Sequence, residues 1–293
     1  MLTLGVVLAV AALVVPAGAV RNSPAALVTT HTAEAVGHSP NVIWILCLGS
    51  DARPGQAVTA TRADAIQLVG VNVRTGAATD IGIPRDSYVD IPGHGRNKIN
   101  AAMFYGGPQL MADVVGNMVG IHPDYVFTTG FKGFWSMVHS IGGVTVHSKY
   151  AWSAPQVRPQ GFHVGKNHLN GVQALAFGRE RHALPRGDFD RSANQQELLR
   201  SILRKVHARE DQPGFMERGL MSAFRNLNTN LRPSELFTLA QAVTQIRLSR
   251  FRGCVVNGST GYVGAASVVF PNISQARSIA HRARNDATLN GPC

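Results

Sequence analysis

The stretch DAIQLVGVNVRTGAATDIGI, residues 64–83, contains two apolar segments separated by three turn-forming residues. Residues 64–73 and 77–83 each have the length and composition of a buried β-strand, and Pro84 ends the second. The connection Arg74–Gly76 is so short that the two strands should form an antiparallel hairpin. A further apolar run, residues 41–48, predicts a third buried strand that ends at Gly49.

The hairpin predicts where polar residues gather. Residues just before its first strand and just after its second must lie at the same edge of the sheet. If the strand 41–48 runs parallel to the strand 77–83, residues 49–53 reach that edge as well. Ligands of open α/β sheets commonly bind at strand ends. The side chains brought to this edge are Asp51, Arg53, Arg62, Asp64, Arg85 and Asp86.

Helical patterns follow the strands. Pro108 is a plausible first-turn residue of a helix over residues 108–120, and another helix is expected over 131–141, before a strand beginning at Val144. Asn170 is a candidate N-cap of a short helix. An apolar stripe over residues 198–206 indicates a helix that begins near Ser192. The alternation predicts α/β layers, with helices packed on a central sheet, in a single domain over residues 41–293.

The N-terminal residues 2–20 form a continuous apolar run without a charged side chain. This length suits a transmembrane anchor, but the small residues at 17–19 also fit a cleaved signal peptide. No basic residue precedes the run, and a buried core helix is a third interpretation. We expect residues 21–40 to be a linker. The domain would then be extracytoplasmic, held by a single-pass anchor in the cell membrane, or secreted if the segment is cleaved.

Three cysteines are present. Cys47 lies in an apolar run and is expected to be a buried structural thiol. An extracytoplasmic location would permit a disulfide between Cys254 and Cys293. Their spacing fits no thiolate zinc site.

The chain carries 28 Lys and Arg against 17 Asp and Glu, a net charge of +11. Such an excess favours anionic partners, which are nucleic acids, lipid headgroups or phosphorylated substrates. No helix-turn-helix, zinc-finger or aromatic-basic RNA-binding motif is recognisable. A nucleic-acid-binding regulator is therefore the less favoured alternative, and we expect no nucleic-acid partner.

A second basic stretch, FGRERHALPRGDFDR, spans residues 177–191. Arginine offers a planar fork of donors that matches phosphate oxygens, and carboxylates beside phosphates often hold Mg²⁺. Taken singly, each Arg–Asp pair could be an ordinary surface ion pair. Arg186, beside Pro185 and Gly187, is expected to be such a surface residue. The groups taken together suit a diphosphate, whose charge must be neutralised when one phosphate leaves.

Eight motifs, in this order and at these separations, match a known family: LGSDAR (48–53), RADA (62–65), IPRD (83–86), NKINAA (97–102), YGGP (105–108), GGVTV (142–146), LNGVQALAFGRERH (169–182) and GDFDRSANQQ (187–196). The chain resembles the LytR–CpsA–Psr family. That resemblance implies a membrane-anchored transferase that moves a glycopolymer from a polyprenyl-pyrophosphate carrier to peptidoglycan, with Mg²⁺ or, as an alternative, Mn²⁺. It also implies an α-β-α sandwich with a mixed central sheet and an apolar lipid tunnel.

The resemblance assigns roles to residues of this chain. Asp51 and Asp64 would hold the metal. The catalytic group would be Arg85, Asp86, Arg179, Arg181 and Asp188. The pyrophosphate would be bound by Arg53, Arg62, Lys98, Asn100, Arg191 and Gln195. One departure is that RADA has Ala63 and Ala65 where the family usually has hydroxyl residues, so a minor polar contact is absent.

The implied reaction is displacement at phosphorus by a sugar hydroxyl. Asp86, Asp188 and, less favoured, His182 are candidates for the general base. Two alternatives keep the same site. One is a pyrophosphatase that uses water as the nucleophile, and the other is a non-catalytic protein that binds lipid-linked glycan. The transferred polymer is left open between arabinogalactan, teichoic acid, capsule and others.

Overall fold

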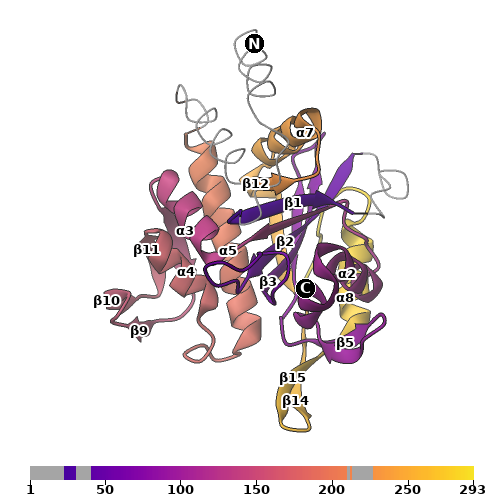
Figure 1. Cartoon of the computed structure of the whole chain (residues 1–293). Helices are drawn as coiled ribbons and strands as arrows, with labels where there is room; N and C mark the ends of the chain where they lie inside the picture. Colours follow the sequence, from indigo (N-terminus) through magenta and orange to yellow (C-terminus); the bar gives the residue numbers. More distant parts are fainter. Residues whose placement is uncertain (1–22, 31–40, 210–211, 213–226) are drawn as a thin grey trace.

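The computed structural model describes residues 23–30, 41–209, 212 and 227–293. Its centre is a seven-stranded sheet of order β12-β1-β7-β2-β3-β4-β13 (Figure 1). The β1–β7, β2–β3 and β3–β4 pairs are antiparallel, whereas β1–β12, β2–β7 and β4–β13 are parallel, so the sheet is mixed as expected. The strands are β1 Ala25–Thr29, β2 Val42–Ser50, β3 Ala63–Asn72, β4 Ala78–Gly82, β7 Tyr125–Thr129, β12 Leu227–Thr229 and β13 Phe251–Val255.

The predicted hairpin is present. Strands β3 and β4 pair from Gln67 with Gly82 to Val71 with Ala78. In the turn, the side chain of Asn72 accepts hydrogen bonds from the backbone N–H groups of Arg74 and Thr75, both at 3.0 Å. Because β2 and β4 are both antiparallel to β3, they run in the same direction, and the condition for a shared edge is met.

Helices cover both faces of the sheet, which confirms the α-β-α arrangement (Figure 1). Trp44, Leu46 and Leu48 alternate along β2 and pack on one face in a cluster that includes residues of α2 Ala101–Val119 and α8 Ile273–Ala283. The opposite face is covered by α3 Phe131–Ser140, α4 Gly171–Arg179, α5 Asp188–His207 and α7 Pro233–Thr244.

The described residues also form four small two-stranded sheets and one 3₁₀ helix. Two of these sheets are hairpins that matter for the site: β5 Tyr88–Ile91 with β6 Gly95–Lys98, and β14 Gly258–Val263 with β15 Ala266–Pro271. The hairpin β14–β15 projects from the body of the molecule (Figure 1). The others are β8 Val144–Ser148 with β11 Gly165–Leu169, and β9 Trp152–Ala154 with β10 Arg158–Phe162, and the 3₁₀ helix is η1 Leu248–Arg250.

The structure confirms one element boundary and corrects two. The backbone leaves helical geometry at Gly106 and Gly107, with Gly107 at φ 65°, so the expected helix start at Pro108 is confirmed. A helical stretch that begins at Ala101 precedes this break within α2 and was not expected. Helix α5 begins at Asp188, ahead of Ser192. Within the expected linker, residues 25–29 form β1 of the central sheet, where alanine and β-branched side chains pair with β7.

The cysteine predictions have mixed outcomes. Cys254 and Cys293 form a disulfide, as the sequence permitted. Cys47 packs against two core clusters and also lines a cavity, so its expected burial is met in part. The apolar run 2–20 lies outside the described residues. Among the helices that the structure does describe, none combines the length and apolarity needed to cross a membrane.

Candidate functional site

The ends of β2, β3 and β4 meet at one edge of the sheet, as the hairpin predicted. The backbone N–H of Asp51 donates to the carbonyl of Arg62 at 3.1 Å, and the backbone N–H of Arg62 donates to Asp51 Oδ1 at 3.0 Å. Arg85, which follows β4, forms an ion pair with Asp64 at the start of β3. These contacts bring the three stretches predicted from the sequence into one cluster.

Two carboxylates from distant segments are held beside this cluster. Asp86 contacts Lys98 Nζ at 3.1 Å, and Asp188 contacts Arg191 at 3.1 Å. Nη1 of Arg181 lies 3.4 Å from Asp86 and 3.6 Å from Asp188. The carboxylates are therefore bridged by one guanidinium, and cations outnumber carboxylates in the cluster. An anion that entered here could replace the carboxylates as partners of the arginines.

Burial and neighbouring charges shift the pKa values of Asp86 and Asp188 in opposite directions. Burial raises the pKa of Asp86, but hydrogen bonds with Asp188 and Lys98 outweigh it, so the pKa lies below its ordinary value. Burial raises the pKa of Asp188 above its ordinary value; Arg191 opposes this, and the hydrogen bond with Asp86 adds to it. Two interacting carboxyls with different proton affinities can accept and release a proton as a unit.

Helix α4 delivers two arginines to the site from its C-terminal end. Asn170 caps the helix as expected, in a capping box with Gln173. After the last turn, Glu180 Oε1 accepts hydrogen bonds from the backbone N–H groups of residues 181, 182 and 183, which fixes the chain direction. Arg179 lies with its guanidinium 4.4 Å from the ring centre of Phe131. Within the described residues, no carboxylate pairs with Arg179.

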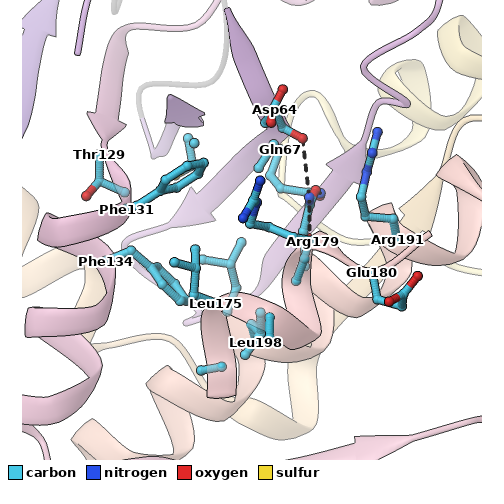
Figure 2. Close-up of a pocket in the computed structure, with 18 of the residues that line it drawn as sticks. Asp64, Gln67, Thr129, Phe131, Phe134, Leu175, Arg179, Glu180, Arg191 and Leu198 are labelled. Atoms are coloured by element: carbon cyan, nitrogen blue, oxygen red, sulfur yellow. Dashed lines mark hydrogen bonds between the residues drawn. The ribbon is translucent and has the colours of Figure 1, made fainter. Parts of the chain in front are cut away.

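A cavity of about 580 Å³ opens beside these groups. One end is polar, with Asp64, Arg85, Arg181 and Arg191 among its lining residues. Figure 2 shows Asp64 and Arg191 at this end and Phe134, Leu175 and Leu198 on the other walls. The apolar wall consists mainly of Phe127, Phe131, Phe134, Met137, Leu175, Leu198, Leu199 and Ile202. A cavity of this kind suits a ligand with an anionic group and an apolar chain.

Gln67 is a member of the site that the sequence reasoning missed. It is buried in the middle of β3, and its Nε2 donates to Ser192 Oγ and Gln195 Oε1, both at 3.2 Å. Gln195 in turn donates to the carbonyl of Gly178 at 3.0 Å. These amides tie β3, α4 and α5 together at the cavity wall. A lone amide inside an otherwise apolar strand was the available signal.

Other predicted residues take different positions. Arg53 and Arg62 are exposed and lie outside the cavity lining, so their binding role stays a prediction. Asn100 is buried, and its backbone N–H donates to the carbonyl of Arg85 at 3.2 Å, which positions that residue. Arg186 pairs with Asp190 at 2.7 Å and remains largely exposed, as expected. His182 is exposed at the cavity rim.

The carboxylates at this edge have the chemistry that Mg²⁺ requires. Asp51 and Asp64 each use Oδ1 for a protein contact, and no hydrogen bond from the described residues reaches either Oδ2. The described part of the chain contains no group of three or more His, Cys, Asp or Glu residues that could hold a metal alone. Magnesium commonly uses one or two carboxylates and completes its shell with water and substrate phosphate. The donor set therefore fits a metal that arrives with a diphosphate.

Known proteins share this sequence and fold. TagU of Bacillus anthracis, a polyisoprenyl-teichoic acid–peptidoglycan teichoic acid transferase, is 31% identical over 201 residues. TagU of Bacillus subtilis strain 168 is 36% identical over 164 residues, which are 55% of this chain and 51% of that protein. The match to the B. anthracis relative covers 67% of this chain but 63% of the relative's length.

Solved structures agree. The crystal structure of B. subtilis TagV superposes with a TM-score of 0.69 at 26% identity, over 83% of this chain and 96% of that one. TagT bound to LIIa-WTA gives a TM-score of 0.67 at 28% identity, over 84% and 91%. The sequence model of the LytR_cpsA_psr family matches residues 19–285, a region that contains every site residue described above. The chain therefore belongs to the LytR–CpsA–Psr family.

Proposed function

We propose that this chain transfers a glycopolymer from a polyprenyl diphosphate carrier to peptidoglycan and forms a phosphodiester link. The observation that carries the proposal is the cavity, which joins an apolar wall to an arginine-rich end at the edge of the sheet. The relatives named above are transferases of teichoic acid to peptidoglycan, and this supports the same class of reaction. The polymer that this chain carries stays open.

The donor would lie with its prenyl chain along the apolar wall and its diphosphate at the polar end. Arg85, Arg181 and Arg191 line that end, and each forms an ion pair with at least one carboxylate. Arg179 lacks such a partner among the described residues and lies on the Phe131 ring, between the two kinds of wall. It is the cation most available to capture the diphosphate before the other arginines exchange their partners.

The reaction is a displacement at phosphorus. A hydroxyl oxygen of a peptidoglycan sugar forms a bond to the phosphorus nearer the glycan, and the bond to the bridging oxygen breaks. The prenyl monophosphate leaves with the electron pair of that bond, and the polymer becomes attached through a phosphodiester. Charge grows on the leaving phosphate, and the arginines stabilise it.

The Asp51 and Asp64 carboxylates are the residues that we expect to hold Mg²⁺ with the diphosphate. The ion would supply further neutralisation of the phosphate oxygens. The proton of the attacking hydroxyl would pass to the Asp86–Asp188 pair. Asp188, whose pKa is raised by burial, is the more basic of the two and is therefore the expected proton acceptor in its ionised form.

We also propose that the domain acts outside the cytoplasm, held by the N-terminal segment or released after its cleavage. The Cys254–Cys293 disulfide supports this location, because such bonds persist in oxidising compartments.

The test uses the purified chain with a prenyl diphosphate-linked glycan, peptidoglycan and Mg²⁺. We expect polymer attached to peptidoglycan and an equal amount of prenyl monophosphate. Arg85→Ala should lower attachment by at least about a hundredfold, since it removes a cation from the transition state. Arg186→Gln, outside the cavity, is the matched control. Attachment that survives intact in Arg85→Ala would overturn the catalytic assignment. Prenyl monophosphate released without attachment would identify a pyrophosphatase.

A further inference from the structure

The segment Arg85–Ser87 is held on both sides by hairpins. On one side, the N–H of Ile99 donates to the carbonyl of Ser87 at 2.7 Å, directly after the hairpin β5–β6. On the other side, the N–H of Val269 on β15 donates to the carbonyl of Asp86 at 2.9 Å. Whatever binds to these hairpins is thus held in a fixed position relative to the Asp86 carboxyl.

One face of β5–β6 is continuous with the charged cluster. Tyr88 pairs with Lys98, and Asp90 pairs with Arg96, so these side chains lie on the same face of the hairpin. Lys98 reaches Asp86, and the guanidinium of Arg96 lies 4.9 Å from the centre of the Tyr88 ring. The buried side chains Val89 and Ile91 face the opposite way, into the core.

The second hairpin adds an aromatic ring to this face. Phe270 on β15 meets Tyr88 edge to face, with ring centres 6.2 Å apart at 78°. It stays 38% exposed, although a phenylalanine of this size would normally be covered. Tyr88, Arg96 and Phe270 therefore form a small platform of two aromatic rings and one guanidinium, which we call the hairpin platform.

The hairpin platform is not part of the cavity wall. Asp64, Arg85, Arg181 and Arg191 line the cavity, whereas Asp86, Lys98 and the hairpin platform lie outside its lining. A donor bound in the cavity would leave the surface beside Asp86 accessible to the second substrate. Sugar rings carry a face of C–H groups that packs on aromatic rings, and their hydroxyl and carboxylate groups pair with a guanidinium.

We propose that the hairpin platform binds the glycan strand of the acceptor, with sugar rings on Tyr88 and Phe270 and polar groups on Arg96. This inference rests on the proposed transferase function and assigns its second substrate to a surface. The platform would present an acceptor hydroxyl to Asp86 while the prenyl diphosphate occupies the cavity. The hairpin platform would hold the acceptor, whereas the arginines that line the cavity would bind the donor.

The test compares Phe270→Ser and Arg96→Gln with a matched control, Tyr262→Ala. Tyr262 is 74% exposed on the same hairpin β14–β15, but the register places it on the face opposite Phe270. The probe is a soluble oligosaccharide of alternating N-acetylglucosamine and N-acetylmuramic acid that carries stem peptides. Each platform variant should raise the acceptor KM, and the Kd for the oligosaccharide, roughly tenfold. Tyr262→Ala should leave both unchanged.

A donor assay separates the two proposals. Each variant should bind a prenyl diphosphate with the affinity of the unaltered chain. Its unfolding temperature should also lie within about 3 °C of that of the unaltered chain. If both platform variants bind the donor, transfer it and keep an unchanged acceptor KM, the assignment of the platform is overturned, and the proposed function is not affected. An unaltered chain that binds no prenyl diphosphate would overturn the proposed function itself. An equal loss in Tyr262→Ala would point to general hairpin damage and would also contradict the assignment.

Discussion

Asp86 and Asp188 contact the same nitrogen atom, Nη1 of Arg181, although one follows β4 and the other begins α5. Each also has a cation of its own, Lys98 for Asp86 and Arg191 for Asp188. The pair is thus embedded in positive charge, yet the pKa of Asp188 is raised and that of Asp86 is lowered. Because the two carboxyls differ in proton affinity, the pair suits proton transfer.

The first prediction concerns the pH dependence of transfer. The ionised form of Asp188 is the base, so kcat/KM should fall as the pH drops through its raised pKa. Burial raises that pKa most strongly. Arg191 lowers it, and the neighbouring Asp86 raises it further. Asp86→Asn removes the charge of Asp86 and should move the acidic limb of the profile to lower pH, besides lowering the rate. Asp113→Asn, on the surface of α2, should leave the profile in place. An acidic limb that keeps its midpoint in Asp86→Asn would show that the pair does not carry the proton.

The second prediction separates two arginines of one basic stretch. Arg179 lies at the cavity, whereas Arg186 is bound to the buried carboxylate of Asp190. Arg179→Gln should raise the KM for the prenyl diphosphate donor about 10- to 100-fold, since it removes a charge-assisted hydrogen bond. Arg186→Gln should lower the unfolding temperature, because Asp190 loses its partner, but leave the donor KM within about twofold. Equal effects of both variants on KM would contradict the assignment.

Much of this site was predictable because a short turn fixes geometry. The turn Arg74–Gly76 requires that Asp64 and Arg85 lie at one edge, and the structure pairs them. The short turn between these two apolar strands then determines how the residues of β3 pair with those of β4. Contacts made across long sequence separations carry no such local signal. The approach of Asp188 to Asp86 depends on how α5 packs on the sheet, so the sequence without its relatives could only suggest both as candidates.

The misses have physical reasons as well. The segment 25–29 has five residues, two of them alanines, so its strand character comes from pairing with β7 and β12. Gln67 lies in an apolar strand, and its role depends on amides supplied by α5. The helical stretch from Ala101 to the break at Gly106 and Gly107 was missed, because Pro108 alone gave a clear signal for a helix start.

The third prediction tests the apolar wall. Leu175 on α4 lines the cavity, whereas Val172 on the same helix is 53% exposed outside its lining. Leu175→Glu should weaken binding of a long-chain prenyl diphosphate at least about tenfold, because a carboxylate in an apolar cavity is costly to desolvate. Binding of isopentenyl diphosphate, which is too short to cover this wall, should change much less. Val172→Glu is the matched control, and a loss of long-chain binding there would count against the cavity as the lipid site.

The fourth prediction concerns a buried carboxyl beneath the site. Asp80 on β4 is fully buried, and neither of its oxygens has a hydrogen-bond partner of normal geometry among the described residues. Burial raises its pKa to about 8, against the lowering influence of Gln196 and Arg200. The folded state therefore holds this proton more tightly than the unfolded chain, whose Asp pKa is about 4. Stability should fall as the pH rises from about 4 to 8.

Asp80→Asn removes that dependence. The variant should be more stable than the unaltered chain at pH 8, on the order of 3–5 kcal/mol, and within about 1 kcal/mol of it at pH 4. Urea unfolding at both pH values measures this difference. Asp90→Asn, exposed on β5, should follow the unaltered chain at both. A difference between Asp80→Asn and the unaltered chain that does not grow with pH would refute the buried-proton explanation.

The fifth prediction concerns the disulfide at the C-terminus. Cys254 is buried on β13, opposite Ile81 of β4, and it bonds to Cys293 at a separation of 39 residues. Closing a loop of that length restricts the unfolded chain by about 4 kcal/mol. Cys293→Ser should lower the free energy of unfolding by about 2–4 kcal/mol. Dithiothreitol should cause a similar loss in the unaltered chain and none in the variant, in which Cys47 remains a protonated thiol because burial raises its pKa to about 12. A further loss of stability when Cys293→Ser is reduced would contradict this account. That variant has already lost the Cys254–Cys293 bond, which is the disulfide of the described residues.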